Sequence, residues 1–80
     1  MRQTLIIQCS NYFEYIHLKD SVFIRDNTNI EFFDKTHTMR MFDYWEFDPL
    51  IQIIIQQAPN CKLTRKLTKN NKTTYLKLKD

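Results

Sequence analysis

The residues best suited to chemistry are the basic side chains near the end of the sequence. The last twenty residues, CKLTRKLTKNNKTTYLKLKD, contain six lysines and one arginine. Ammonium groups bind phosphate oxygens and carboxylates, so a row of them suits a polyanion such as nucleic acid or an acidic protein surface. We expect a partner or phosphate to contact the lysines and the tyrosine of this segment, namely Lys62, Lys66, Lys69, Lys72, Tyr75, Lys77 and Lys79.

The alternation of these residues predicts a β-hairpin over 61–79. Asn70-Asn71 is a good two-residue turn, because asparagine tolerates the left-handed geometry that such turns need. With this turn, one face carries Leu63, Arg65 and Leu67 opposite Leu78, Leu76 and Thr74. The other face carries Lys62, Thr64, Lys66 and Thr68 opposite Lys79, Lys77, Tyr75 and Thr73. The sequence thus predicts that four leucines dock against the domain and that lysines and threonines face outward.

Charge is distributed unevenly along the chain. Residues 51–80 contain seven Lys or Arg and one acidic residue, whereas residues 1–50 contain five Lys or Arg and eight acidic residues. In the predicted register Lys62 stands opposite Lys79, and like charges directly opposite each other are destabilising unless an anion lies between them. A polyanionic partner would relieve that repulsion.

An interpretation of the basic hairpin without a binding partner also stays open. Lysines on a strand also keep a sheet edge from pairing with other chains and keep a small protein soluble. Ten of the eleven aromatic residues lie between Tyr12 and Phe47, and only Tyr75 lies in the basic segment. Proteins that bind single strands interleave aromatic rings with positive charge. Duplex or protein contact is therefore favoured over base stacking, unless folding brings the aromatic region beside the lysines.

A second candidate surface is the segment MFDYWEFD. Trp and Tyr are frequent anchors of protein interfaces, so a protein-docking patch is predicted at Asp43, Tyr44, Trp45 and Glu46. The other interpretation, that Trp45 fills the core, is the favoured one, since an 80-residue domain has few other large side chains to bury.

Enzymatic and metal-binding motifs are missing from the sequence. The chain has no glycine, which excludes phosphate-binding loops, dinucleotide fingerprints and the nucleophile elbow. His17, His37, Cys9 and Cys61 show no ligand spacing such as C-x-x-C. We predict no catalytic residue, no metal and no cofactor, and expect the cysteines to be free, half-buried thiols in a reducing compartment.

The pattern of apolar residues predicts a single small α+β domain over residues 1–80, mostly antiparallel sheet with one short helix and a C-terminal β-hairpin. Residues 1–47 form a strand-rich aromatic region, a meander with strands at 4–9, 12–18, 22–25, 30–33 and 39–47, the last of which fits neither period well. The helix is predicted at residues 48–58, because Asp48-Pro49 is a favourable helix N-terminus and Pro59 ends a helix. Leu50, Ile51, Ile54 and Ala58 then share one face, although the isoleucines also suit a buried strand.

These features together predict a non-enzymatic binding protein that acts as an inhibitor or adaptor on a protein or nucleoprotein complex. No apolar run is long enough for a signal or a membrane span, so a cytoplasmic location is expected. Small size, the lack of glycine and the many Asn, Lys and Ile residues resemble the composition of short reading frames in AT-rich phages and mobile elements. That resemblance suggests an anti-defence, anti-CRISPR-like inhibitor. The alternative function is a nucleic-acid-binding regulator, acting as a homodimer, that uses the basic hairpin directly.

Overall fold

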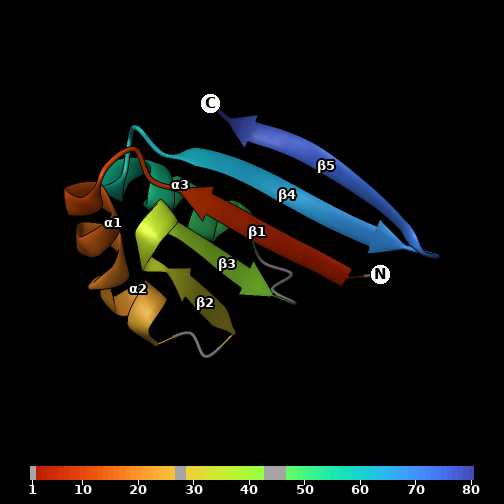
Figure 1. Cartoon of the computed structure of the whole chain (residues 1–80), viewed down its shortest axis with the longest axis horizontal. Coiled ribbons are helices and arrows are strands. Elements are labelled where there is room, and N and C mark those ends of the chain that lie inside the picture. Colours follow the sequence, from red (N-terminus) through yellow and green to blue (C-terminus); the bar gives the residue numbers. More distant parts are fainter. Residues whose placement is uncertain (1, 27–28, 43–46) are drawn as a thin grey trace.

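Five antiparallel strands form one sheet in the computed structural model of the chain, and helices pack on one of its faces (Figure 1). The structure describes residues 2–26, 29–42 and 47–80. Within these ranges the elements are β1 (Arg2–Gln8), α1 (Tyr12–Lys19), α2 (Val22–Arg25), β2 (Ile30–Phe33), the 3-10 turn η1 (Asp34–Thr36), β3 (Thr38–Phe42), α3 (Phe47–Gln57), β4 (Lys62–Lys69) and β5 (Lys72–Lys79). The predicted small α+β domain with an antiparallel sheet is confirmed.

The sheet is not a meander, because β1 lies at its centre. The strand order is β2-β3-β1-β4-β5, so the first strand pairs with β3 on one side and β4 on the other. Residues 4–9 and 30–33 are strands close to the predicted bounds, and the segment predicted at 39–47 is a strand only as far as Phe42. The two edge strands are the short β2 and the longer β5.

Two segments predicted as strands, 12–18 and 22–25, are the helices α1 and α2. The Asn11 side chain caps α1 by accepting a hydrogen bond from the Glu14 amide at 2.8 Å. Glu14 in turn accepts one from the Ser10 amide, in a variant of the capping box. Tyr15 and Leu18, three positions apart, point into the core. These local hydrogen bonds outweigh the strand preference of the aromatic residues, and the structure has three α-helices in the described ranges where one was predicted.

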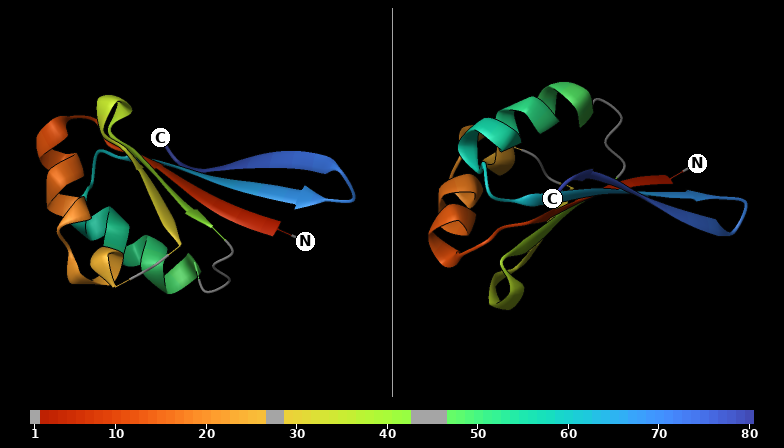
Figure 2. Two further views of the ribbon diagram at one scale, coloured as in Figure 1. Left: turned by 60° about the horizontal axis from the view of Figure 1, so that its bottom comes forward. Right: turned by 90° about the horizontal axis from the view of Figure 1, so that it is seen from above.

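The long helix was predicted correctly. α3 begins at Phe47, two residues before Pro49, and ends before Pro59. Its buried face contains Leu50, Ile51 and Ile54, and Ala58, directly after the last helical residue, is buried with them, as predicted. α3 lies across one face of the sheet, and α1 and α2 pack beside it at one end (Figure 2). The core between these layers contains Leu5, Ile7, Cys9, Tyr15, Leu18, Ile24, Met39, Met41, Leu50, Ile51, Ile54, Ala58, Cys61 and Leu63.

The C-terminal hairpin has the predicted turn, with Asn70 and Asn71 at φ values of 51° and 65°. Most of the predicted register is confirmed, including Arg65 opposite Leu76 and Lys66 opposite Tyr75. An irregularity between Leu63 and Thr64 changes the last pairs. Leu63 stands opposite Lys79, so the predicted pairs of Leu63 with Leu78 and of Lys62 with Lys79 are wrong. An extra residue on β5 is the signature of a β-bulge, which the sequence pattern does not reveal.

Only part of the predicted leucine contact is made. Leu63 is buried, and Leu67 and Leu78 are half-buried. Leu76 keeps 50% of its surface exposed, although the register places it on the same side of the hairpin. Leu76 lies on β5, the edge strand, which has a neighbouring strand on one side only. Figure 2 shows that the turn of this hairpin also extends beyond the helices.

Candidate functional site

The face of the sheet that points away from α3 is the main candidate site. Side chains alternate between faces along each strand, and directly opposite residues share a face. The side chains buried under the helices are those of Leu5, Ile7, Met39, Met41 and Leu63. The residues directly before and after each of them in the same strand therefore point to the other face. We call this side the open face, and its side chains are those of Arg2, Thr4, Ile6, Gln8, Glu31, Phe33, Thr38, Arg40, Phe42, Lys62, Thr64, Lys66, Thr68, Thr73, Tyr75 and Lys77.

One row across the open face interleaves aromatic and basic groups. The register aligns Phe42, Thr4, Lys66 and Tyr75 on the four neighbouring strands β3, β1, β4 and β5. Tyr75 is 62% exposed, whereas Thr4, between Phe42 and Lys66, is only 6% exposed. With strands about 4.8 Å apart, the two ends of this row are separated by about 14 Å. The fold therefore brings the aromatic region beside the lysines, which the sequence left open.

Arg40 and Phe33 extend the open face toward β2. The guanidinium carbon of Arg40 lies 5.0 Å from the centre of the Phe33 ring, in a cation–π contact. Glu31 stands opposite Arg40 and lowers the positive charge at this edge. Arg40 and Phe42 were not among the predicted site residues. The alternation in TMRMF, where Met39 and Met41 are buried, indicates that Arg40 and Phe42 point to the opposite face.

The structure separates the seven residues predicted on the hairpin. Four of them lie on the open face, namely Lys62, Lys66, Tyr75 and Lys77. Alternation places Lys69 and Lys72, which stand opposite each other beside the turn, on the face of the helices. Lys79 is engaged elsewhere, because its ammonium donates hydrogen bonds to the carbonyls of Pro59 and Cys61. It ties β5 to the loop after α3.

The ammonium of Lys77 is partly neutralised by the Asp80 carboxylate, 2.8 Å away. This ion pair is well exposed, with 69% of the Lys77 side chain and 77% of the Asp80 side chain accessible. Exposed pairs of this kind contribute little and exchange readily with other partners. Lys77 can therefore leave Asp80 for a phosphate or carboxylate at small cost.

The predicted docking patch at Asp43, Tyr44, Trp45 and Glu46 lies outside the described residues. Exposed apolar side chains are found instead on the helices. Phe13 is 85% exposed, and Tyr12 and Val22 are 54% and 68% exposed. These side chains lie on α1 and α2, away from the strands of the open face.

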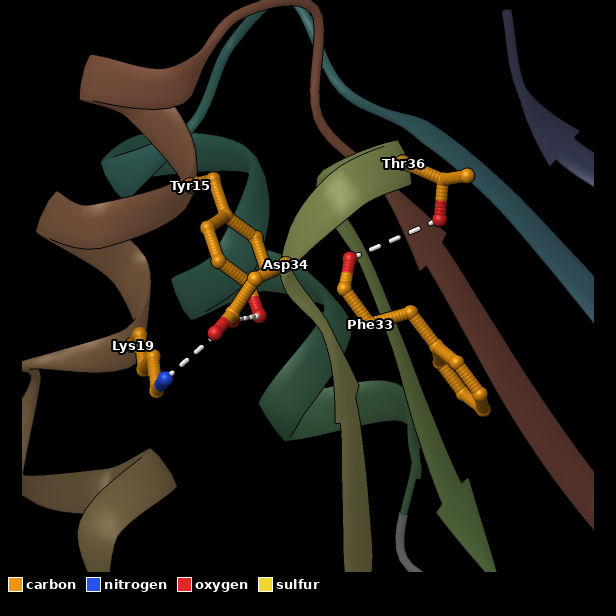
Figure 3. A network of polar contacts seen from close by, with 5 residues as sticks. All are labelled: Tyr15, Lys19, Phe33, Asp34 and Thr36. Atoms are coloured by element: carbon orange, nitrogen blue, oxygen red, sulfur yellow. Dashed lines mark hydrogen bonds and ion pairs between the residues drawn. The ribbon is translucent and has the colours of Figure 1, made fainter.

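A polar contact joins α1 to the turn after β2 (Figure 3). The buried Tyr15 hydroxyl donates a hydrogen bond to the Asp34 carboxylate, and the Lys19 ammonium lies 3.3 Å from the same oxygen. Burial and this hydrogen bond both raise the pKa of Tyr15. The Tyr15 hydroxyl, followed by Lys19, lowers the pKa of Asp34. In Figure 3 the Phe33 ring points away from this group, toward the other side of the sheet.

Replacing Tyr15 with phenylalanine is expected to raise the pKa of Asp34, because the main donor to its carboxylate is lost. A carboxylate whose pKa is lowered by folding stabilises the fold above the unfolded value of about 3.9, and that contribution is lost as the pH falls through the folded value. NMR titration of the Asp34 carboxyl carbon between about pH 5 and pH 2 measures both midpoints. A midpoint that is equal in the two proteins would contradict the assignment.

The two cysteines are free thiols, as predicted, but they are buried rather than half-buried. They stand at adjacent ends of β1 and β4, where the register places Gln8 opposite Lys62. Burial, with a smaller effect of Glu14, raises the pKa of Cys9 to about 12. The thiolate is the reactive form, so Cys9 is a poor nucleophile and a poor metal ligand at neutral pH.

A hollow, metal ligands and membrane spans are the alternatives to the open face. A hollow of about 320 Å³ at one end of the β1–β4 pair is lined by Gln8, Cys9, Ser10, Asn60 and Lys62. Among the described residues, no three His, Cys, Asp or Glu side chains converge as metal ligands would. No helix in the described part of the chain is long and apolar enough to span a membrane.

Comparisons with protein-family models, curated proteins and solved structures found no match for this chain. The functional argument therefore depends on the geometry and chemistry of the open face.

Proposed function

We propose that the protein binds single-stranded nucleic acid on the open face of its sheet. The observation that carries this proposal is the row in which Phe42 and Tyr75 flank Thr4 and Lys66. Bases of a single strand stack on aromatic rings, and lysines hold the phosphates between them. Thr4 is only 6% exposed, so the larger side chains beside it form the surface of this row.

The basic groups of the open face support the same proposal. Arg2, Arg40, Lys62, Lys66 and Lys77 share this face with only one acidic residue, Glu31, and with Asp80 beside Lys77. Contacts with phosphates supply most of the sequence-independent affinity for nucleic acid. Stacking on a ring adds about 1–3 kcal/mol per base. Together these groups suit a single strand of unspecific sequence better than a duplex, whose bases are already stacked.

In this role the protein is a non-enzymatic, cytoplasmic binding protein, and its target is naked nucleic acid or the exposed strand of a nucleoprotein complex. The raised pKa of Cys9 and of Tyr15 supports a function without covalent chemistry, since neither group is activated as a nucleophile or base. If the bound nucleic acid is the single strand of a nucleoprotein complex, binding would inhibit that complex. This is the anti-defence activity that the composition of the sequence suggests.

A second candidate is an inhibitor or adaptor that docks on a protein. The exposure of Phe13, Tyr12 and Val22 favours it, because these side chains lie on the helices and can contact a partner while the open face remains accessible. The two functions are compatible in one molecule, although each can be tested alone.

The proposal is tested by fluorescence anisotropy of labelled single-stranded DNA, single-stranded RNA and duplex DNA at about 50 and about 200 mM salt. We expect the single strands to bind more tightly than the duplex. With up to five phosphate contacts, affinity should fall by about a hundredfold between the two salt concentrations. Absence of binding to every nucleic acid at the lower salt would overturn the proposal and favour a protein partner.

Replacing Tyr75 or Phe42 with leucine is expected to weaken binding to single strands by about 1–3 kcal/mol, because the apolar volume is largely kept but the ring is lost. Duplex binding should change much less. The matched control is Tyr12→Leu, which removes an exposed tyrosine from α1 rather than from the open face. Equal losses in all three variants, measured by the same titration, would contradict a stacking role for the row.

A further inference from the structure

The outer edge of β5 is the longest unpaired strand edge in the described sheet. β5 is the last strand in the order β2-β3-β1-β4-β5, and residues 72–77 are exposed. β2, at the opposite edge, has four residues against eight in β5. Short edges resist pairing with other chains, whereas long regular ones invite it.

The turn determines which backbone groups point outward. In a two-residue hairpin the residues beside the turn, Lys69 and Lys72, form a hydrogen-bonded pair. Such pairs alternate along an antiparallel ladder, so Thr74 and Leu76 also bond to β4. The N–H and C=O groups of Thr73, Tyr75 and Lys77 therefore point away from β4, toward whatever lies beside the edge.

The side of β5 that faces the helices carries an incompletely covered apolar strip. Leu76 is 50% exposed, and Leu67 and Leu78 are half-buried. Next to the turn is a hollow of about 360 Å³ lined by Leu67, Lys69, Asn70, Lys72 and Thr74. An added strand would cover Leu76 and the rim of this hollow at Thr74.

We propose that this added strand is β5 of a second copy, paired antiparallel with Leu76 opposite Leu76 of the partner subunit. In this register the outward-pointing groups of Tyr75 meet those of Lys77 of the partner subunit. Thr74 stands opposite Leu78 of the partner subunit, so the apolar strips of both copies become continuous. The twofold axis passes between the two Leu76 residues, perpendicular to the sheet, as closed symmetry requires.

Charge selects this register among the alternatives. Centring the pair on Lys77 would place that lysine opposite its own copy, where like charges repel. Centring it on Thr74 would place Leu76 opposite Lys72 of the partner subunit. With Leu76 at the centre, Lys77 faces the Tyr75 ring of the partner subunit, a favourable cation–π pair, and no lysine faces a lysine. Centring it on Tyr75 would also keep the lysines apart, but it would place Leu76 opposite Thr74 of the partner subunit. The Leu76-centred register is therefore the one that combines contact between leucines, the cation–π pair and separated lysines.

The pairing also joins the two open faces. Antiparallel strands related by an axis perpendicular to the sheet present the same face on the same side. Lys66 and Tyr75 of one copy are then followed, across the new pair, by Lys77 of the partner subunit. An interface of a few paired residues lies at the small end of specific interfaces, so we expect a dimer that dissociates on dilution.

The register is tested with cysteine variants, since Cys9 and Cys61 are buried. Leu76 and its copy would form a pair without backbone hydrogen bonds, whose Cα atoms are about 4.5 Å apart and within reach of a disulfide. Under mild oxidation we expect Leu76→Cys to form a covalent dimer. Thr74→Cys, which is at the same edge but opposite residue 78, should stay monomeric alone and should cross-link when mixed with Leu78→Cys.

A second measurement does not depend on those substitutions. Sedimentation of the unmodified protein without nucleic acid should show a concentration-dependent dimer. Tyr75→Pro should abolish the dimer, because proline at an edge removes only the outward N–H, while Tyr75→Thr, which keeps that N–H, should dimerise. A monomer at every concentration, or cross-linking of Thr74→Cys as complete as that of Leu76→Cys, would overturn the proposal. Because these readouts need no ligand, they are independent of nucleic-acid binding.

Discussion

Replacing both Lys66 and Lys77 with glutamate is expected to weaken binding to single-stranded nucleic acid on the order of a hundredfold at about 0.1 M salt. The two lysines lie on the open face, on the neighbouring strands β4 and β5. The variant loses two phosphate contacts and places two carboxylates beside the bound nucleic acid, which repel its phosphates. Because each contact adds about 0.7 to the slope of log affinity against log salt for single strands, the slope should also become shallower by about 1.4 or more.

The hairpin offers a closely matched control for this result. Lys69→Glu combined with Lys72→Glu changes the net charge equally in the same hairpin, but alternation places these side chains on the face of the helices. This control should lose far less affinity, and its salt slope should stay close to that of the unmodified protein. Anisotropy titrations at several salt concentrations measure both quantities, with circular dichroism to verify folding. Equal losses in the two double variants would show that only net charge matters and that the open face is not the binding site.

Replacing Ile54 with alanine is expected to lower the free energy of unfolding by about 2–5 kcal/mol. Ile54 is fully buried in the centre of the α3 face that packs on the sheet. At about 0.05–0.15 kcal/mol per residue, the whole domain has only about 4–12 kcal/mol of stability, so this one change can unfold a large share of the molecules. Urea titration followed by circular dichroism measures the loss.

The neighbouring Ile53 provides the control for this change. It is on the same helix and is 39% exposed. Ile53→Ala removes the same atoms from a site that water already reaches, so the loss should stay below about 1 kcal/mol. If the two variants lost the same stability, the helix would not pack on the sheet through the face described above.

Local patterns in the sequence predicted the parts of the fold whose interactions are local. The hairpin follows from Asn70-Asn71 and the alternation around it, and α3 follows from its apolar face and flanking prolines. α1 was missed because its aromatic residues favour strands, although Asn11 followed by Glu14 three positions later is an N-terminal capping signal. The bulge in the hairpin has no comparable sequence signature.

The open face could be predicted only in part because it depends on contacts between distant segments. Lys66 and Tyr75 were identified together, since both lie in one hairpin. Phe42 joins them only because β1 pairs with β3 on one side and with β4 on the other. No local pattern specifies that strand order, so the combination of rings and lysines emerges from the topology.

The central position of β1 has a consequence for how the chain folds during synthesis. β1 is synthesised before its partner β4, which begins only at Lys62, after both β3 and α3. Ribosomes add about 5–20 residues per second, so β4 is synthesised several seconds after β1. Until then the apolar side chains of β1 are only partly buried. Contacts between such distant segments also slow folding itself. During this interval Leu5 and Ile7 are the residues that a chaperone, or an aggregating neighbour, would meet first.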